Sequence, residues 1–169
     1  MDREIKTNTD NTHFRTGLFA KCTCPDEFET ELNKIYFDNC YLIPCISETP
    51  CPYEGRTAHI FLYGSCHIFA SQLCKIYEDY NVYEIMNSSG RTIHWYAQTY
   101  YKNMPIYIDV RGATTSFEEF ISEFRPHIVD GYKIQKQNKE LPFSEEDWIE
   151  TGILFATAII NEYAEYYCI

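Results

Sequence analysis

The sequence is poor in basic residues. Its 169 residues include 14 Lys and Arg against 25 Asp and Glu, so the formal net charge at pH 7 is −11. Affinity for nucleic acid rests largely on Lys and Arg side chains that neutralise phosphates. The charge balance therefore predicts no nucleic-acid partner. It favours a basic partner or substrate, or simply an acidic surface that keeps the protein soluble.

Long apolar runs and nucleotide-binding patterns are also missing. The longest apolar run, ILFATAII at residues 153–160, is far shorter than the roughly 20 residues that a membrane-spanning helix needs. The N-terminal stretch MDREIKTNTDNTHFR is polar and lacks the apolar segment of a secretory signal. No glycine-rich phosphate-binding loop occurs, which predicts no nucleotide cofactor. We therefore expect no membrane partner, a cytoplasmic location and reduced cysteines.

The chain is rich in apolar and aromatic residues. Hydrophobic residues make up 45% of it, with 15 tyrosines and 11 phenylalanines, which is enough to build a packed core. Residues 1–24 show no regular period and are rich in Thr, Asn and Asp, which predicts a flexible N-terminal arm. We expect residues 25–169 to form a single domain.

The apolar spacing within that domain predicts a mixture of helices and strands. Alternating Val, Ile, Tyr and Trp with Gly or Asn turns predicts a three-stranded antiparallel meander at 81–87, 92–101 and 105–110. Segment 128–136 is a further strand or edge, and 58–63 is a strand or a lead-in. We expect helices at 26–38, 65–79, 114–124 (with a capping box at Ser116 and Glu119) and from Ser144 to 163, and a long loop at 39–57. The fold class is therefore α+β, a small antiparallel sheet packed against helices.

Cys66 lies where such a helix begins. It follows Gly64 and Ser65 in YGSCHIFASQLC, and apolar residues at helical spacing follow it. Free N–H groups and the helix dipole stabilise negative charge at a helix N-terminus, so this position favours a thiolate. Cys66 is therefore a candidate nucleophile, and a nucleophile needs a base and a residue that orients the base.

His94 and Asp109 are the candidate partners. His94 lies in the second strand of the meander and Asp109 at the end of the third. Neighbouring antiparallel strands can bring both side chains to one face, and strand alternation places His94, Tyr96 and Gln98 together on it. We expect His94 to act as base and then acid, Asp109 to orient its imidazole, and the Cys66 backbone N–H to stabilise an oxyanion.

Other residues carry weaker expectations. His67 should point a different way around the helix from Cys66, which makes it a poor base. Arg111 either closes a turn or contacts a substrate carboxylate. Five cysteines lie close together without the two-pair spacing that zinc sites usually show, so we predict no metal, and a zinc-binding domain remains an alternative. These five are Cys22, Cys24, Cys40, Cys45 and Cys51.

The segments GSCHIFASQL, HWY and YIDVRG resemble the cysteine, histidine and aspartate motifs of the papain-like cysteine enzymes, in their transglutaminase-like branch. The similarity covers roughly residues 58 to 112. It implies a papain/transglutaminase-like fold and catalytic roles for Cys66, His94 and Asp109. The chain departs from transglutaminases because no tryptophan precedes Cys66, so His59 or Tyr63 would have to supply a second oxyanion donor.

The resemblance implies a cysteine-dependent acyl-group hydrolase or transferase. Such an enzyme would form a thioester with a peptide, isopeptide or glutamine side-chain amide, and would need no cofactor. A peptide or protein substrate is the expected partner. The alternative is a noncatalytic acidic binding or inhibitor protein that captures a basic partner.

Overall fold

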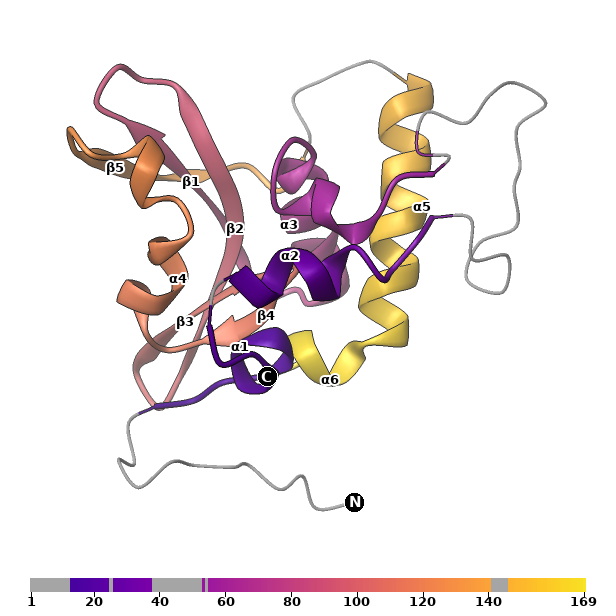
Figure 1. The fold of residues 1–169 in the computed structure, drawn as a ribbon, viewed down its shortest axis with the longest axis horizontal. Helices are drawn as coiled ribbons and strands as arrows, with labels where there is room; N and C mark the ends of the chain where they lie inside the picture. Colours follow the sequence, from indigo (N-terminus) through magenta and orange to yellow (C-terminus); the bar gives the residue numbers. More distant parts are fainter. Residues whose placement is uncertain (1–12, 25, 38–52, 54, 141–145) are drawn as a thin grey trace.

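A computed structural model describes residues 13–24, 26–37, 53, 55–140 and 146–169 of the chain. These residues form a mixed α+β structure around a five-stranded antiparallel sheet, as expected (Figure 1). In chain order the elements are α1 (Gly17–Lys21), α2 (Asp26–Leu32), the 3₁₀ helix η1 (Ala58–Phe61), α3 (Cys66–Ile76), β1 (Asn81–Asn87), β2 (Thr92–Tyr101), β3 (Met104–Asp109), β4 (Gly112–Thr114), α4 (Phe117–Ser122), the 3₁₀ helix η2 (Arg125–His127), β5 (Tyr132–Gln137), α5 (Glu146–Glu162) and α6 (Ala164–Tyr167).

The strand order in the sheet is β4-β3-β2-β1-β5, and every neighbouring pair is antiparallel. The three strands of the predicted meander are confirmed as β1, β2 and β3. Lys102 and Asn103 connect β2 to β3 with φ values of 49° and 66°, which suits a tight hairpin turn. Segment 128–136 contains most of β5, at the edge of the sheet. The three-residue strand β4 was not predicted, because it is too short to show a pattern.

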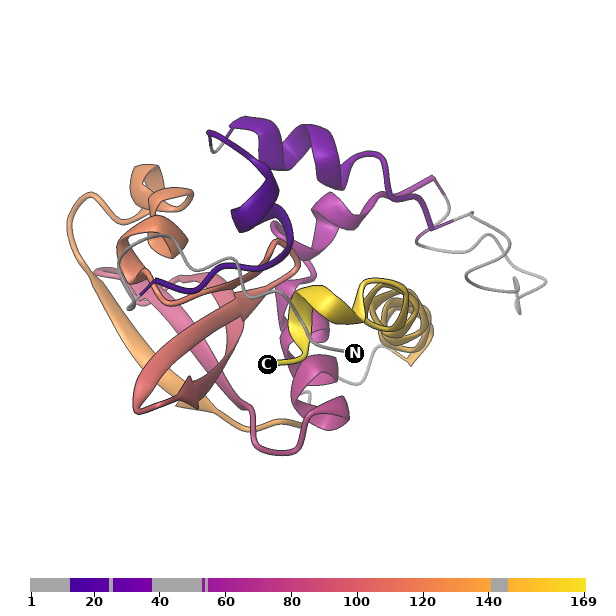
Figure 2. The same ribbon diagram turned by 90° about the horizontal axis from the view of Figure 1, so that it is seen from below.

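The central strands of the sheet are covered on both faces (Figure 2), whereas the edge strand β5 is mostly exposed. On one face, rings of β2 and β3 pack against α4; the Tyr96 and Phe120 ring centroids are 4.9 Å apart. On the other face lies α3, which also packs against α5. The face of β2 that carries His94 and Tyr96 is therefore buried beneath aromatic side chains rather than exposed to water.

The helices follow the apolar spacing in part. Helix α3 begins at Cys66, and the expected cap of α4 is confirmed, since Ser116 Oγ accepts a hydrogen bond from the Glu119 N–H at 3.2 Å. Segment 58–63 is a lead-in to α3, mostly 3₁₀ helix. Helix α2 ends at Leu32 instead of 38, because the Lys34 and Ile35 N–H groups bond to carbonyls three residues back and tighten the turn. Ser144 and most of the predicted loop 39–57 lie outside the described residues.

Part of the N-terminal segment that we expected to be a flexible arm is folded. Helix α1 buries Leu18 and Phe19, at 5% and 1% exposed. The Thr16 N–H donates to the Ala113 carbonyl at 2.8 Å, which ties the segment to β4. Residues assigned to the arm thus include a packed helix, which the sequence did not predict because five residues are too few to show a period. Residues 1–12 lie outside the described part.

The turn between β3 and β4 accepts hydrogen bonds from residues near the N-terminal and the C-terminal end of the described fold. From the N-terminal side, the Leu18 N–H donates to the Arg111 carbonyl at 2.6 Å. From the C-terminal side, the Tyr167 hydroxyl of α6 donates to the Val110 carbonyl at 2.9 Å. Thr16 closes the arrangement by donating its hydroxyl to the Tyr166 carbonyl. Asp109 and Arg111 thus lie on a turn that both chain ends stabilise.

Gly112 permits this close approach, and replacing it should destabilise the protein. Its φ is +120°, and an added Cβ would lie 2.5 Å from the Thr16 carbonyl oxygen. We expect Gly112→Ala to lower the free energy of unfolding by about 3 kcal/mol or more, since backbone strain and a clash with backbone combine. Urea unfolding measures the change.

Gly90→Ala is the matched control for Gly112→Ala. Gly90 also has a positive φ, +81°, but an added Cβ would meet nothing within 4 Å. Only backbone strain applies, so a loss of about 1 kcal/mol is expected. Equal losses in the two variants would contradict the close packing of Thr16 on Gly112.

Candidate active site

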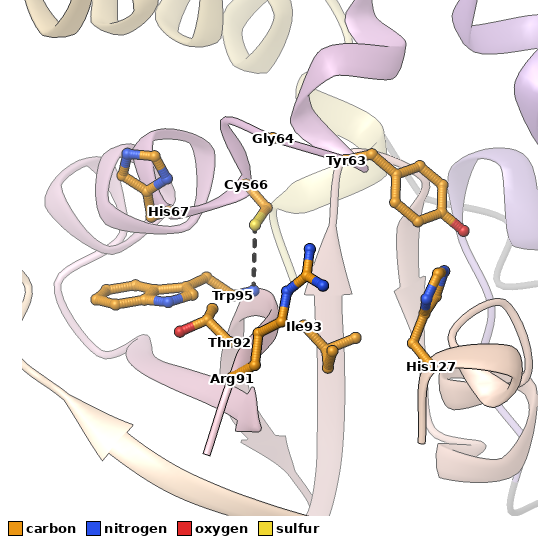
Figure 3. Close-up of a pocket in the computed structure, with 9 residues that line it drawn as sticks. All are labelled: Tyr63, Gly64, Cys66, His67, Arg91, Thr92, Ile93, Trp95 and His127. Carbon is orange, nitrogen blue, oxygen red and sulfur yellow. Dashed lines mark hydrogen bonds between the residues drawn. The ribbon is translucent and has the colours of Figure 1, made fainter. Parts of the chain in front are cut away.

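Cys66 is the first helical residue of α3, and its thiol is buried, with the residue 6% exposed. Gly64 precedes it with a φ of +110°, a conformation that glycine adopts readily. The buried Ser65 hydroxyl is hydrogen-bonded to the Tyr53 hydroxyl at 2.9 Å, which anchors the residue before the cysteine. The Trp95 backbone N–H of β2 donates to the Cys66 sulfur at 3.4 Å (Figure 3). This donation favours negative charge on the sulfur.

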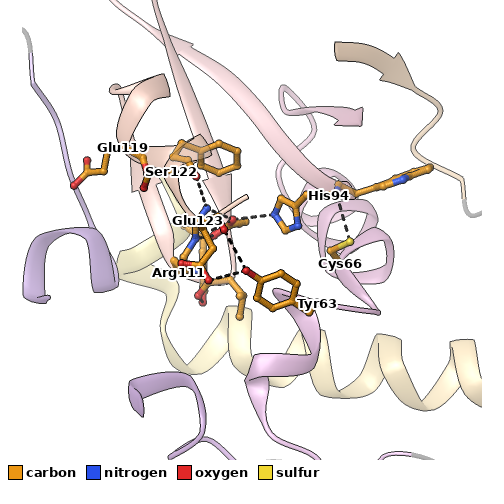
Figure 4. Close-up of polar contacts among 12 residues, drawn as sticks. Tyr63, Cys66, His94, Arg111, Glu119, Ser122 and Glu123 are labelled. Atoms are coloured by element: carbon orange, nitrogen blue, oxygen red, sulfur yellow. Dashed lines mark hydrogen bonds and ion pairs between the residues drawn. The ribbon is translucent and has the colours of Figure 1, made fainter. Parts of the chain in front are cut away.

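His94 lies beside Cys66. It belongs to β2, the strand that also carries Trp95. Its Nε2 is 3.0 Å from Asp109 Oδ2, and the two side chains are 0% and 2% exposed. The His94 ring also stacks on Phe124, with centroids 4.3 Å apart. Figure 4 shows the imidazole between Cys66 on one side and the Arg111 side chain on the other. Because Asp109 engages Nε2, Nδ1 is the nitrogen left for the thiol.

The thiol and the imidazole shift each other's pKa. Burial alone would raise the Cys66 pKa, but interactions with the side chains of His67 and His94 outweigh burial and lower it to about 6. Burial also opposes protonation of His94, yet the hydrogen bond with Asp109 and the interaction with Cys66 raise its pKa. A thiolate beside an imidazolium is the state that these shifts favour at neutral pH.

Arg111 is the second partner of Asp109. Its Nη2 donates to Asp109 Oδ2 at 2.7 Å, and its backbone N–H donates to Oδ1 at 2.9 Å. Burial would raise the Asp109 pKa, but the charge of Arg111 and the hydrogen bond with His94 hold it well below the ordinary range. Asp109 therefore stays ionised, and it can orient His94 and stabilise imidazolium.

The environment of Arg111 excludes a direct role with substrate. Its side chain is completely buried, and its guanidinium carbon lies over four phenylalanine rings at 4.7 to 5.4 Å. Its Nη2 also donates to the Phe120 carbonyl at 3.0 Å. The interpretation that Arg111 contacts a substrate carboxylate is therefore wrong. The rings belong to Phe19, Phe28, Phe120 and Phe124.

A pocket of about 470 Å³ opens beside Cys66 (Figure 3). Tyr63 is part of its wall, but its hydroxyl donates to Glu123 Oε1 at 2.7 Å and is thus already engaged (Figure 4). His59 is not part of the wall. The lining residues are Tyr63, Gly64, Cys66, His67, Arg91, Thr92, Ile93, Trp95 and His127.

The structure brings together the three residues singled out in the sequence, Cys66, His94 and Asp109. It adds a role for His67 that was not expected, because His67 lines the pocket and lowers the Cys66 pKa. Sequence reasoning missed two contributions. Nothing in the pattern marks the Trp95 N–H as a donor to the thiol. The pairing of Arg111 with Asp109 had only their close spacing as a signal.

The zinc alternative concerns residues that are largely outside the described part of the chain. Cys40, Cys45 and Cys51 lie there, whereas Cys22 and Cys24 are described as free thiols. Within the described ranges, no three His, Cys, Asp or Glu side chains lie close enough together to hold a metal ion. The described helices also include none with the length and apolar character needed to cross a bilayer.

Comparison of the chain with protein-family models, with curated proteins and with solved structures finds no match. The geometry and chemistry of the site itself are therefore what bears on its function.

Proposed function

We propose that this protein is a cysteine-dependent acyl-group hydrolase or transferase that acts through a thioester on a peptide, isopeptide or glutamine side-chain amide. One observation carries the proposal. The Cys66 thiol, whose pKa is lowered to about 6, lines a pocket. The same thiol lies beside the His94 imidazole, and Asp109 is hydrogen-bonded to the far side of that ring. An activated thiol with an oriented base is what nucleophilic catalysis requires.

In the proposed first step, the Cys66 thiolate attacks the carbonyl carbon of the amide. An S–C bond forms, the C–N bond breaks, and the His94 imidazolium gives its proton to the leaving amine. The products are a thioester on Cys66 and a free amine, with His94 left neutral. Asp109 keeps its charge throughout and holds the ring in place.

In the second step, water or a second amine attacks the thioester. His94 accepts the proton of the attacking group, the S–C bond breaks, and the Cys66 thiolate is restored. Water gives a carboxylic acid and an amine gives a new amide. The two outcomes share every residue of the site, so the acceptor alone distinguishes hydrolysis from transfer.

The backbone N–H of Cys66 is the proposed donor to the oxyanion of each tetrahedral intermediate. As the first N–H of α3 it has no acceptor within its own helix, because the first four N–H groups of a helix lack one. The Tyr63 hydroxyl is engaged by Glu123, which argues against it as the second donor.

The order of the site along the chain supports a place in the papain-like enzymes, in their transglutaminase-like branch. The cysteine starts a helix, and the histidine and aspartate follow on the adjacent antiparallel strands β2 and β3. The proposed chemistry needs a reduced thiol, which fits a reducing compartment such as the cytoplasm.

Alkylation tests the activated thiol directly. With iodoacetamide, the rate at Cys66 should follow its thiolate fraction, so it rises through a midpoint near pH 6 and levels off above it. The exposed Cys24 serves as the internal control in the same sample. Peptide mapping by mass spectrometry across a pH series measures both sites in one sample.

His94→Gln is the matched variant for the alkylation test. It removes the imidazolium while keeping a polar side chain, so the midpoint at Cys66 should move up toward about 8.5. If unaltered Cys66 reacts no faster than Cys24 at neutral pH, the noncatalytic reading takes over. In that reading the acidic protein binds a basic partner.

A further inference from the structure

The pocket beside Cys66 has an arginine in its lining, although the chain as a whole is acidic. Asp and Glu outnumber Lys and Arg by 25 to 14 in the sequence, but none of the residues that line the pocket is Asp or Glu. Arg91 contributes a permanent positive charge, and His67 and His127 contribute imidazoles. Among the residues that line the pocket, Arg91 is therefore the one with a permanent charge.

The backbone of Arg91 is held firmly at the start of the pocket wall. Asn87 Oδ1 accepts hydrogen bonds from the backbone N–H groups of Ser89 at 3.1 Å and Arg91 at 2.9 Å. The Asn87 N–H in turn donates to the Arg91 carbonyl at 2.9 Å. These bonds set the turn between β1 and β2 and place Arg91 three residues before His94.

The guanidinium of Arg91 is available to a ligand. It makes no hydrogen bond or ion pair with any residue that the structure describes, whereas Arg15, Arg111 and Arg125 are each paired with a carboxylate. Figure 3 shows its side chain extending into the pocket on the side where Cys66 lies. Apolar side chains, above all Ile93 and Trp95, form much of the remaining wall.

We propose that Arg91 makes this pocket selective for acyl substrates that carry a carboxylate next to the reacting carbonyl, such as peptides with Asp or Glu beside the amide that is attacked. This inference rests on the function proposed above and names its substrate class. A guanidinium pairs with a carboxylate through two parallel hydrogen bonds, which fixes orientation as well as attraction. The apolar wall accommodates the neighbouring part of the substrate.

Two small alkylating reagents test the selectivity without a known substrate. Iodoacetate and iodoacetamide react alike, since the sulfur forms an S–C bond and iodide leaves, but only iodoacetate carries a carboxylate. The measurement is the ratio of their rates at Cys66 at about pH 8, where a thiol with a pKa of about 6 is ionised. In Arg91→Gln, the iodoacetate to iodoacetamide ratio should fall about threefold to fivefold, the size expected of one exposed charge pair. About 0.5 M NaCl should reduce the ratio of the unaltered protein in the same direction.

Lys102→Asn is the matched control for Arg91→Gln. It removes the same charge beyond the opposite end of β2, and asparagine tolerates the positive φ of 49° at that turn. The ratio should stay unchanged in this variant. An unchanged ratio in Arg91→Gln, with Cys66 still fast toward iodoacetamide, would overturn the carboxylate selectivity and leave the proposed function standing. Slow reaction of Cys66 with both reagents would overturn the proposed function itself.

Discussion

Cys66→Ala is expected to abolish turnover, with a loss on the order of 10⁴-fold or more in kcat/KM, because no thioester can form without the sulfur. His94→Ala should be nearly as severe. It removes the counter-ion that lowers the thiol pKa and the group that protonates the leaving amine. The assay is hydrolysis of peptide amides found by screening a fluorogenic library. Thermal unfolding of each variant verifies that it is folded.

The losses from these two substitutions should not add. Cys66→Ala combined with His94→Ala should be no worse than Cys66→Ala alone, as expected for residues that act as one unit. Additive losses would mean that His94 contributes through a route independent of the thiol. Full biological effect in a folded Cys66→Ala variant would instead support the binding-protein alternative.

Arg111→Met should strongly destabilise the fold, by about 3–5 kcal/mol, because it removes the permanently charged partner of the buried Asp109 and leaves only His94 beside that carboxylate. Methionine keeps much of the contact with the surrounding phenylalanine rings, so the loss reports the charge rather than a cavity. Urea unfolding measures it. A loss below about 1 kcal/mol would show that the Asp109–Arg111 pair does not hold this part of the structure.

A double-mutant cycle separates the pair from its surroundings. Asp109→Asn leaves the Arg111 charge buried and unpaired, so it should destabilise the protein as well. Combining it with Arg111→Met removes both charges, and the double variant should lose less than the sum of the single losses. This sub-additivity is the signature of a buried ion pair.

The Asp109–Arg111 pair also determines how the stability of the fold should depend on pH in the acid range. The Asp109 pKa is lower in the folded chain than the value of about 3.9 expected when unfolded. Its contribution to stability is therefore complete above about pH 4 and is lost as the pH falls below that toward the folded pKa. The urea midpoint of Asp109→Asn should depend less on pH in this acid range than that of the unaltered protein.

The sequence predicted the parts of the site that depend on local pattern. Strand alternation placed His94 correctly, since Gln98 pairs with Tyr107 and this register brings His94 and Asp109 to one face. The start of α3 at Cys66 followed from helical spacing after Gly64. The α+β class followed from the meander and its flanking helices.

The parts that the sequence did not predict depend on contacts between distant segments. From the sequence alone, Arg111 is interpreted as a turn residue. Its enclosure becomes evident only in the structure, where the rings of Phe19 and Phe28, far away in the sequence, lie against its guanidinium. The sequence also cannot show that the Arg91 guanidinium has no carboxylate partner among the described residues, because this depends on where the fold places the Asp and Glu side chains. The proximity of His67 to the pocket was also missed, because helical position alone does not show which side chains of the first turn of α3 line a pocket.

The two-ended support of the β3–β4 turn has a consequence for the order in which the protein folds during synthesis. The Tyr167 hydroxyl that bonds to Val110 belongs to a residue 57 positions later, and Tyr166 accepts from a residue 150 positions earlier. Contacts of such separation form late, because a long loop must close before they contribute. A nascent chain therefore carries Asp109 and Arg111 before α6 exists to fix their turn. We therefore expect this turn to reach its final form only when α6 docks.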